Sequence, residues 1–125
     1  MAYSYDTQNV FARILRGEIP NRTVLETPHS LAFHDASPQA PVHVLVIPKG
    51  AYLNHDHFAE TATEAEIVDF TRAVAQVCKA MGVGPGAGGA GYRLISNAGA
   101  HGLQEVPHLH VHVLAGGVLG PMLGR

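Results

Sequence analysis

The chain has 125 residues, of which 46% are hydrophobic, and its formal net charge is −2. This length allows one domain with a hydrophobic core and leaves little room for a second domain. Lys and Arg total only 8 and form no cluster, so the sequence lacks the basic footprint of a nucleic-acid-binding protein.

The sequence also lacks the features of export and of membrane insertion. Residues 1–15 contain no basic region followed by an apolar run, so they do not resemble a signal peptide. No apolar stretch approaches the length of a membrane span. The sole cysteine, Cys78, excludes an intrachain disulfide and fits a reducing compartment. We therefore expect a cytoplasmic protein that does not bind membranes.

The N-terminal stretch predicts a tail followed by a short helix. Residues 1–6 are expected to be mobile. Thr7 can cap a helix whose apolar residues are spaced to share one face. These residues are Val10, Phe11, Ile14 and Leu15. Gly17 is the expected end of this helix.

Three strands are predicted next. Residues 22–26 and 31–35 flank the turn-forming stretch 27–30, so they are expected to form a hairpin. Residues 43–48 are apolar on both faces of a strand, which predicts a central position in the sheet.

The main helix is predicted to begin at Thr63, because Glu66 three residues later completes a capping-box pattern. Apolar residues then recur at spacings of three and four, and Gly82 is the expected end. A short helix at 54–58 is compatible with the sequence before it. The glycine-rich stretch 84–91 predicts a flexible connection.

The last two strands are predicted at residues 92–97 and 108–115. The order of three strands, a helix and two strands, with short links, predicts an antiparallel α+β sheet covered by helices.

Three histidines alternate with apolar residues in the stretch His108–Leu114. Residues two apart in a strand share a face, so the three imidazoles are expected to line one face, about 6.8 Å apart. The apolar residues Leu109, Val111 and Val113 are then expected to enter a core. On spacing alone the row is compatible with phosphate binding, with nucleophilic catalysis, or with a zinc site that has His43 as a fourth ligand.

The stretch His108–Leu114 matches the His-φ-His-φ-His-φ-φ signature of the histidine triad (HIT) superfamily, where φ is an apolar residue. Further segments resemble its purine nucleoside phosphoramidase branch, the HINT proteins, in order and spacing, and the likeness covers about residues 10 to 117. They include Gly17-Glu18-Ile19-Pro20, Leu31–Asp35, Ser37-Pro38-Gln39-Ala40-Pro41, Val46–Lys49 and Asn97–His108.

This resemblance implies a single HIT domain over residues 1–125, with its core at about 7–117. It implies a five-stranded antiparallel sheet, one long helix and a short N-terminal helix. It also implies a two-fold homodimer in which the two sheets form one continuous ten-stranded sheet.

The activity that the resemblance implies is hydrolysis of the P–N bond of a purine nucleoside phosphoramidate, with no metal and no other cofactor. It assigns attack on phosphorus to His110 and the roles of flanking donors to His112 and His108, with His112 against the phosphate and His108 behind the nucleophile. It places His43 beside them. A nucleotidyl-histidine intermediate is then hydrolysed to AMP or GMP. We expect either His108 or a backbone carbonyl to fix the tautomer of the nucleophile.

The phosphate is expected to contact Asn97, the side chain of Gln104 and the backbone N–H groups of Glu105 and Val106. The backbone of Glu105 is preferred because its carboxylate repels a phosphate. For the nucleoside, the resemblance assigns the ribose hydroxyls to Asp35. The purine is expected in a cleft formed by His34, Phe33, Phe11, Val10, Ile14 and Ile19.

Leu103 departs from the resemblance, because relatives more often have glycine at this place. If the backbone there needs a positive φ, a leucine costs energy. Two other functions stay open at this point. One is hydrolysis of dinucleoside polyphosphates, which also occurs in this superfamily, and the other is a non-catalytic regulator that binds zinc or a nucleotide.

Overall fold

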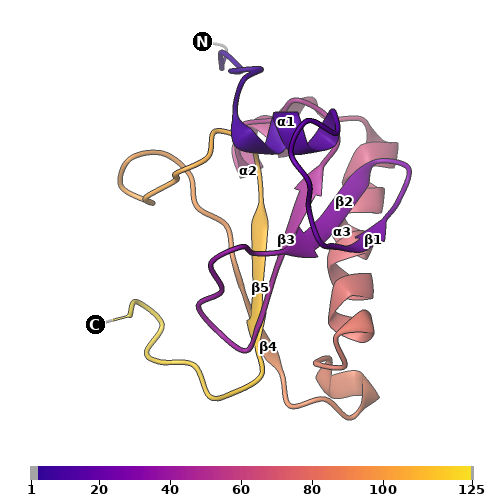
Figure 1. Cartoon of the computed structure of the whole chain (residues 1–125), viewed down its shortest axis with the longest axis vertical. Coiled ribbons are helices and arrows are strands. Elements are labelled where there is room, and N and C mark those ends of the chain that lie inside the picture. The colour runs from indigo at the N-terminus through magenta and orange to yellow at the C-terminus, as the bar shows by residue number, and fades with distance from the viewer. Residues whose placement is uncertain (1–2, 125) are drawn as a thin grey trace.

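A five-stranded antiparallel sheet forms the centre of the computed structural model, which describes residues 3–124 (Figure 1). The strands lie in the order β1-β2-β3-β5-β4, and every neighbouring pair is antiparallel. Their bounds are β1 Thr23–Glu26, β2 Ser30–His34, β3 Val42–Pro48, β4 Tyr92–Ile95 and β5 Val111–Ala115. The predicted α+β class and the central place of β3 are therefore confirmed.

The helices are α1 at Val10–Leu15, α2 at His55–Thr61 and α3 at Glu64–Ala80. The capping box predicted for α3 is present, because the side chains of Thr63 and Glu66 each accept from the other's backbone N–H. The chain leaves α3 through Gly82, whose φ of +70° suits glycine. No helix among residues 3–124 is both long enough and apolar enough to cross a membrane.

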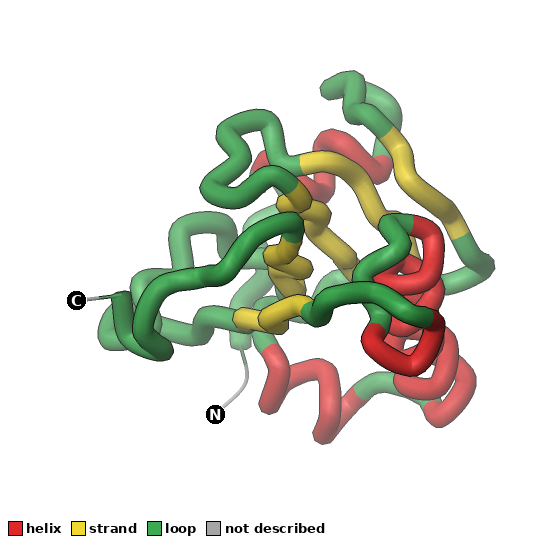
Figure 2. Tube along the Cα trace, turned by 90° about the horizontal axis from the view of Figure 1, so that it is seen from below, coloured by secondary structure: helices red, strands yellow, loops and turns green. Residues whose placement is uncertain are grey.

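Helices α1 and α3 cover opposite faces of the sheet. The side chains of β3 show this, because successive residues of a strand point to opposite faces. From β3, Val44 and Val46 pack with Ala73 and Val77 of α3. Leu45, the residue between them, packs in a second core with Phe11 and Ile14 of α1. Figure 2 shows the strands at the centre, the long helix on one side of them and loops on the other.

The last strand is shorter than predicted. It begins at Val111 instead of His108, because the N–H of Leu109 donates to the carbonyl of Tyr52 at 2.7 Å and not to a neighbouring strand. The predicted sidedness is nevertheless correct: Leu109, Val111 and Val113 all pack in the core beneath α3. The histidines between them are therefore directed to the other face of the sheet.

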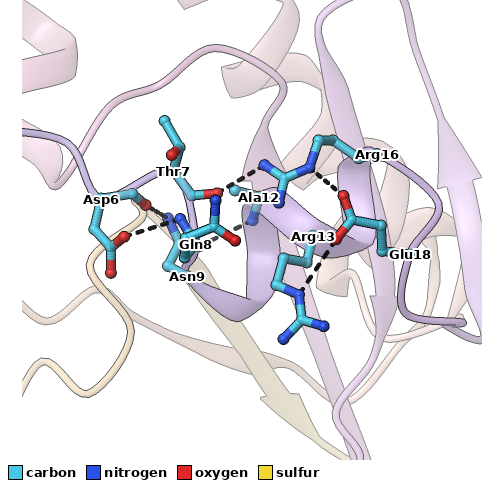
Figure 3. Close-up of polar contacts among 8 residues, drawn as sticks. All are labelled: Asp6, Thr7, Gln8, Asn9, Ala12, Arg13, Arg16 and Glu18. Carbon is cyan, nitrogen blue, oxygen red and sulfur yellow. Dashed lines mark hydrogen bonds and ion pairs between the residues drawn. The ribbon is translucent and has the colours of Figure 1, made fainter.

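The predictions for the N-terminus were wrong in two respects. Asn9, not Thr7, caps α1, because its Oδ1 accepts from the N–H of Ala12 at 2.9 Å (Figure 3). The preceding residues form a turn in which the carbonyl of Asp6 accepts from the N–H of Asn9 at 3.2 Å. The tail is not free either, since Tyr5 hydrogen-bonds inside the molecule. Met1 and Ala2 lie outside the described residues.

The predicted flexible connection at 84–91 also differs from the structure. It contains a short 3-10 helix at Pro85–Ala87, and the N–H of Gly89 donates to the carbonyl of Gly84 at 3.0 Å. A Cβ on Gly89 would lie 2.4 Å from the carbonyl carbon of Val83, so close backbone packing explains this glycine.

Candidate functional site

A cleft of about 420 Å³ lies on the face of the sheet opposite α3. Paired residues of an antiparallel sheet share a face. His43 pairs with Leu114, and Leu45 pairs with His112, so these four side chains line the floor of the cleft. The predicted site residues that line it are Phe11, Asp35, His43, Asn97, Glu105, Val106, His110 and His112.

The ring of His110 is held in one orientation. Its Nδ1 lies 2.7 Å from the backbone carbonyl oxygen of His108. A carbonyl oxygen can only accept, so Nδ1 carries the ring hydrogen and Nε2 keeps its lone pair. Burial lowers the pKa of His110 from 6.5, against the charges of Asp35 and Glu105, so the ring is neutral at neutral pH. His110 thus combines a fixed tautomer with an unprotonated Nε2.

His112 presents the opposite tautomer, as a chain of hydrogen bonds shows. The backbone N–H of Gln39 donates to Nδ1 of His43 at 3.0 Å, which leaves the hydrogen of His43 on Nε2. That Nε2 lies 2.9 Å from Nδ1 of His112 and donates to it. Nδ1 of His112 therefore accepts, and its hydrogen is on Nε2. Burial lowers the pKa of His112 to about 4, so the ring is a neutral N–H donor.

The two rings of His110 and His112 lie side by side, with centroids 5.0 Å apart. One offers a lone pair and the other an N–H. A lone pair can attack an electrophile, and the N–H beside it can donate to an oxygen of the same group. This pairing is the main chemical capability of the cleft.

Asp35 brings a negative charge to the same cleft. Its Oδ1 accepts from the N–H of Ser37 at 2.7 Å, and its Oδ2 lies 3.4 Å from Nε2 of His43. Each carboxylate oxygen has a second lone pair, so Asp35 can still accept from a ligand's hydroxyl groups. Its contact with ribose stays a prediction.

His108 lies behind His110, as predicted, but it does not face the cleft and so cannot act as a flanking donor. It is fully buried, and its Nε2 lies 2.8 Å from the carbonyl oxygen of Pro48. Its Nδ1 lies 2.6 Å from the hydroxyl of Tyr5. Burial lowers the pKa of His108 to about 4. Because both ring nitrogens are engaged inside the protein, neither can reach a phosphate; His108 contributes its backbone carbonyl to His110 instead.

The loop before β5 is braced by the amide of Gln104. Its Nε2 donates to the carbonyls of Leu53 at 2.6 Å and of Val106 at 2.9 Å. Both amide hydrogens are thereby used, so the side chain of Gln104 holds the loop and has no donor left for a phosphate. Within residues 3–124 the backbone N–H groups of Glu105 and Val106 make no hydrogen bond. They remain candidate phosphate donors, as predicted.

Asn97 also shapes this loop. Its Nδ2 donates to the carbonyl of Gly102 at 2.6 Å, which leaves one amide hydrogen and the Oδ1. The residue lines the cleft, so the remaining hydrogen is available to a ligand.

The residues predicted for the purine cleft separate into three groups. Phe11 lines the cleft, with its ring edge-on to His110 at a centroid distance of 5.0 Å. Phe33, Ile14 and Ile19 belong to the core that supports Phe11. The remaining two, Val10 and His34, do not line the cleft, and Val10 is exposed. The wall that the structure offers to a base is therefore smaller than predicted.

Three side chains in the cleft could hold a cation. Ligand atoms of Asp35, His43 and His112 lie within 4.8 Å of one another. However, the hydrogen that His43 donates to His112 occupies the space between two of these atoms. A metal would have to displace that hydrogen, so the present arrangement favours the hydrogen-bonded chain over a metal centre.

Leu103 adopts a φ of +57°, and it is the only non-glycine residue of positive φ among residues 3–124. Its side chain is 79% exposed, so little packing offsets the strain. We expect Leu103→Gly to raise the free energy of unfolding by about 0.5–1 kcal/mol, because relief of the left-handed strain exceeds the entropic cost of glycine. Urea denaturation measures this change.

Val118→Gly is the matched control, because Val118 is also exposed and has no positive φ. That substitution should lower stability, since it brings only the entropic cost. If the Leu103→Gly protein is no more stable than the wild type, the backbone of Leu103 is not strained.

The buried imidazoles predict that acid destabilises the fold. Burial lowers the pKa of His108 and of His112 to about 4 in the folded chain, against 6.5 for a histidine in the unfolded chain, and it also lowers the pKa values of His43 and His110. Between these values the unfolded chain binds more protons than the folded one, so stability is lost as the pH falls from 6.5 towards 4.

The measurement is the urea midpoint at pH 7, 6 and 5 and at a fixed protein concentration. Carboxyl groups with lowered pKa, such as those of Glu66 and Asp69, lose their contribution only at lower pH. A midpoint that stays constant from pH 7 to pH 5 would show that the imidazoles are not buried as neutral rings.

Comparison with known proteins agrees with this architecture. A family model described as the HIT domain matches residues 16–117. An uncharacterized 13.2 kDa HIT-like protein of Azospirillum brasilense is 61% identical over 125 residues, which are 100% of this chain and 99% of that protein. A purine nucleoside phosphoramidase of Escherichia coli is 37% identical over 118 residues, which are 94% of this chain and 95% of that enzyme.

Solved structures show the same fold. A histidine triad protein from Clostridium difficile superposes with a TM-score of 0.80 at 36% identity, covering 94% of this chain and 98% of that one. A HIT family hydrolase from Clostridium thermocellum superposes with a TM-score of 0.77 at 34% identity, covering 93% and 96%. From the sheet, the histidine cleft and these likenesses, we conclude that the chain belongs to the HIT domain family.

Proposed function

We propose that this protein hydrolyses the P–N bond of purine nucleoside phosphoramidates, in which AMP or GMP is joined through nitrogen to an amine. The observation that carries the proposal is the pairing of a neutral His110, whose Nε2 is free, with the N–H of His112 in one cleft. The relative from Escherichia coli that is named a purine nucleoside phosphoramidase supports this substrate class.

In the first step, Nε2 of His110 attacks phosphorus and forms a P–N bond. The substrate nitrogen takes up a proton from solvent, the bond from phosphorus to this nitrogen breaks, and the neutral amine departs with the bonding electron pair. Modification at Nε2 makes the imidazole cationic, and this charge strengthens its Nδ1–H bond to the carbonyl of His108. The N–H of His112 and the backbone N–H groups of Glu105 and Val106 stabilise the phosphoryl oxygens.

In the second step, water attacks phosphorus and the bond to His110 breaks. The products are AMP or GMP and the neutral His110 ring, and the surplus proton passes to solvent. No group in either step needs a metal or another cofactor. We assign the ribose hydroxyls to Asp35 and one face of the purine cleft to Phe11.

The substrate class is tested by comparing kcat/KM for an adenosine phosphoramidate with that for a diadenosine polyphosphate. The proposal expects the phosphoramidate to be much preferred. Preference for the polyphosphate would favour the other reaction of this superfamily. A regulator that binds zinc without turnover is the remaining alternative, and Asp35, His43 and His112 are its candidate ligands. Unchanged activity in excess chelator would reject it, whereas stoichiometric zinc and no turnover of either substrate would support it.

We also propose that two copies join their sheets at β4. This strand is an edge of the sheet, and its Tyr92 and Leu94 are 44% and 45% exposed. A groove of about 500 Å³ beside it is lined by further apolar residues, among them Phe70, Val74 and Val111. Pairing there would cover an edge strand and an apolar surface together. Sedimentation at micromolar concentration should give the mass of two chains, and a single-chain mass would contradict this proposal.

A cytoplasmic location completes the proposal. It is supported by the free thiol of Cys78, which is buried in the core, and by the absence of any second cysteine in the sequence.

A further inference from the structure

Several hydrogen bonds hold the N-terminal segment before α1 against the rest of the protein (Figure 3). The carbonyl of Asp6 accepts from Nδ2 of Asn9 at 2.8 Å, and the buried Asn9 caps α1. Nη1 of Arg16 donates to the carbonyl of Thr7 at 2.7 Å. These bonds fix the position of the backbone next to Tyr5. From there the Tyr5 side chain reaches His108.

Tyr5 directs its hydroxyl at the ring of His108. The hydroxyl oxygen lies 2.6 Å from Nδ1, and the two rings meet edge-on at a centroid distance of 5.6 Å. Nε2 of His108 faces the carbonyl of Pro48 and must carry the ring hydrogen. Nδ1 is therefore an acceptor, and Tyr5 donates to it. Burial raises the pKa of Tyr5 above its usual value, so the hydroxyl stays protonated.

His108 in turn controls the position of the nucleophile. Its carbonyl oxygen accepts from Nδ1 of His110. The ring of Phe11 packs edge-on against both imidazoles, at centroid distances of 6.3 Å from His108 and 5.0 Å from His110. A shift of the His108 ring would therefore move the carbonyl and the aromatic contact that orient His110.

We propose that Tyr5 is a positioning residue for His110: its hydroxyl holds the buried His108 ring, and the carbonyl of His108 holds the nucleophile. Tyr5 lies outside the region matched by the family model, which begins at residue 16. The inference rests on the proposed phosphoramidase activity for its kinetic consequence, but the bond itself can be observed without any substrate.

The test compares the full-length wild type with Tyr5→Phe and Tyr3→Phe. Tyr5→Phe keeps the aromatic packing and removes only the hydroxyl. Tyr3→Phe is the matched control, because the hydroxyl of Tyr3 lies in the same segment but bonds the exposed Asp56, away from the cleft. Each protein is studied by single-turnover release of amine from an adenosine phosphoramidate, by steady-state kinetics that give KM, and by nitrogen NMR of its histidine rings.

For Tyr5→Phe we expect the single-turnover rate to fall roughly tenfold, less than the roughly hundredfold that a 1 Å misplacement can cause. KM should change less than about twofold, because no substrate contact is lost. The Nδ1 resonance of His108 should move towards that of an acceptor without a partner. Tyr3→Phe should match the wild type in all three measurements.

The inference is overturned if the His108 resonance is the same in Tyr5→Phe and the wild type. It is also overturned if both variants lower the rate equally, since the segment would then act only by packing. If the wild type itself releases no amine, the proposed function fails, and the NMR comparison alone decides whether Tyr5 holds His108.

Discussion

His110→Ala is expected to lower kcat/KM for an adenosine phosphoramidate by about 10⁴-fold or more. The alanine removes the Nε2 that forms the covalent bond to phosphorus, and no other group takes its place. The ring of His112 presents an N–H to the cleft, because its Nδ1 already accepts from His43. The ring of His108 is fully buried. The measurement is amine release under single-turnover and steady-state conditions.

The same variant should still bind AMP, because the proposed phosphate and ribose contacts remain. Calorimetry with AMP tests this point. His101→Ala serves as the control, since His101 is exposed and does not line the cleft, and its activity should equal that of the wild type. Turnover by His110→Ala within about tenfold of the wild type would exclude His110 as the nucleophile.

Replacement of His43 is expected to have the second-largest effect. His43→Leu removes the Nε2–H that donates to His112 at 2.9 Å. The His112 ring is then free to place its hydrogen on Nδ1 and to turn a lone pair towards the phosphoryl oxygens. Loss of the correct tautomer can cost up to about 10⁴-fold in a hydrolase whose histidine acts as a base. Because His112 only donates here, we expect a single-turnover rate about 100-fold lower.

His43→Gln is the matched variant, because its side-chain amide can keep an N–H near the place of Nε2. It should recover part of the rate lost in His43→Leu. The pH dependence of stability gives a second readout, since the lowered pKa of His112 depends on burial and on the neighbouring rings of His110 and His43. A His43→Leu protein within threefold of the wild-type rate would contradict the chain from Gln39 through His43 to His112.

The fold could be predicted closely because its signals are local or periodic. The apolar run 43–48 gave the central strand, and the pair Thr63 and Glu66 gave the start of α3. Alternation in His108–Leu114 gave the correct sidedness, with Leu109 and Val113 in the core. Where the strand begins could not be predicted, because the N–H of Leu109 bonds to Tyr52, which is remote in sequence.

The site was less predictable, because its chemistry depends on bonds between imidazoles and backbone groups that no residue pattern specifies. The residue types alone do not show that Pro48 accepts from His108 or that Gln39 donates to His43. The same holds for Gln104, whose side-chain amide donates to the backbone carbonyls of Leu53 and Val106. Tyr5 has no motif at all, and only the folded chain brings it to His108.

Leu103 illustrates a different case. The likeness to a family that favours glycine at this place raised the question of a positive φ, and the backbone indeed adopts +57°. Comparing residue types was sufficient to predict the positive φ of Leu103, because a left-handed backbone conformation is a local property and glycine is the residue that favours it.

The central claim is that His110 becomes covalently bonded to the nucleotide, and trapping this adduct tests it most directly. The wild type is mixed with an adenosine phosphoramidate, quenched within the first turnover and measured by intact mass, and its peptides are then mapped. We predict a gain of one AMP moiety per chain, located on His110. Turnover with no adduct, or an adduct on any other residue, would contradict the proposed mechanism.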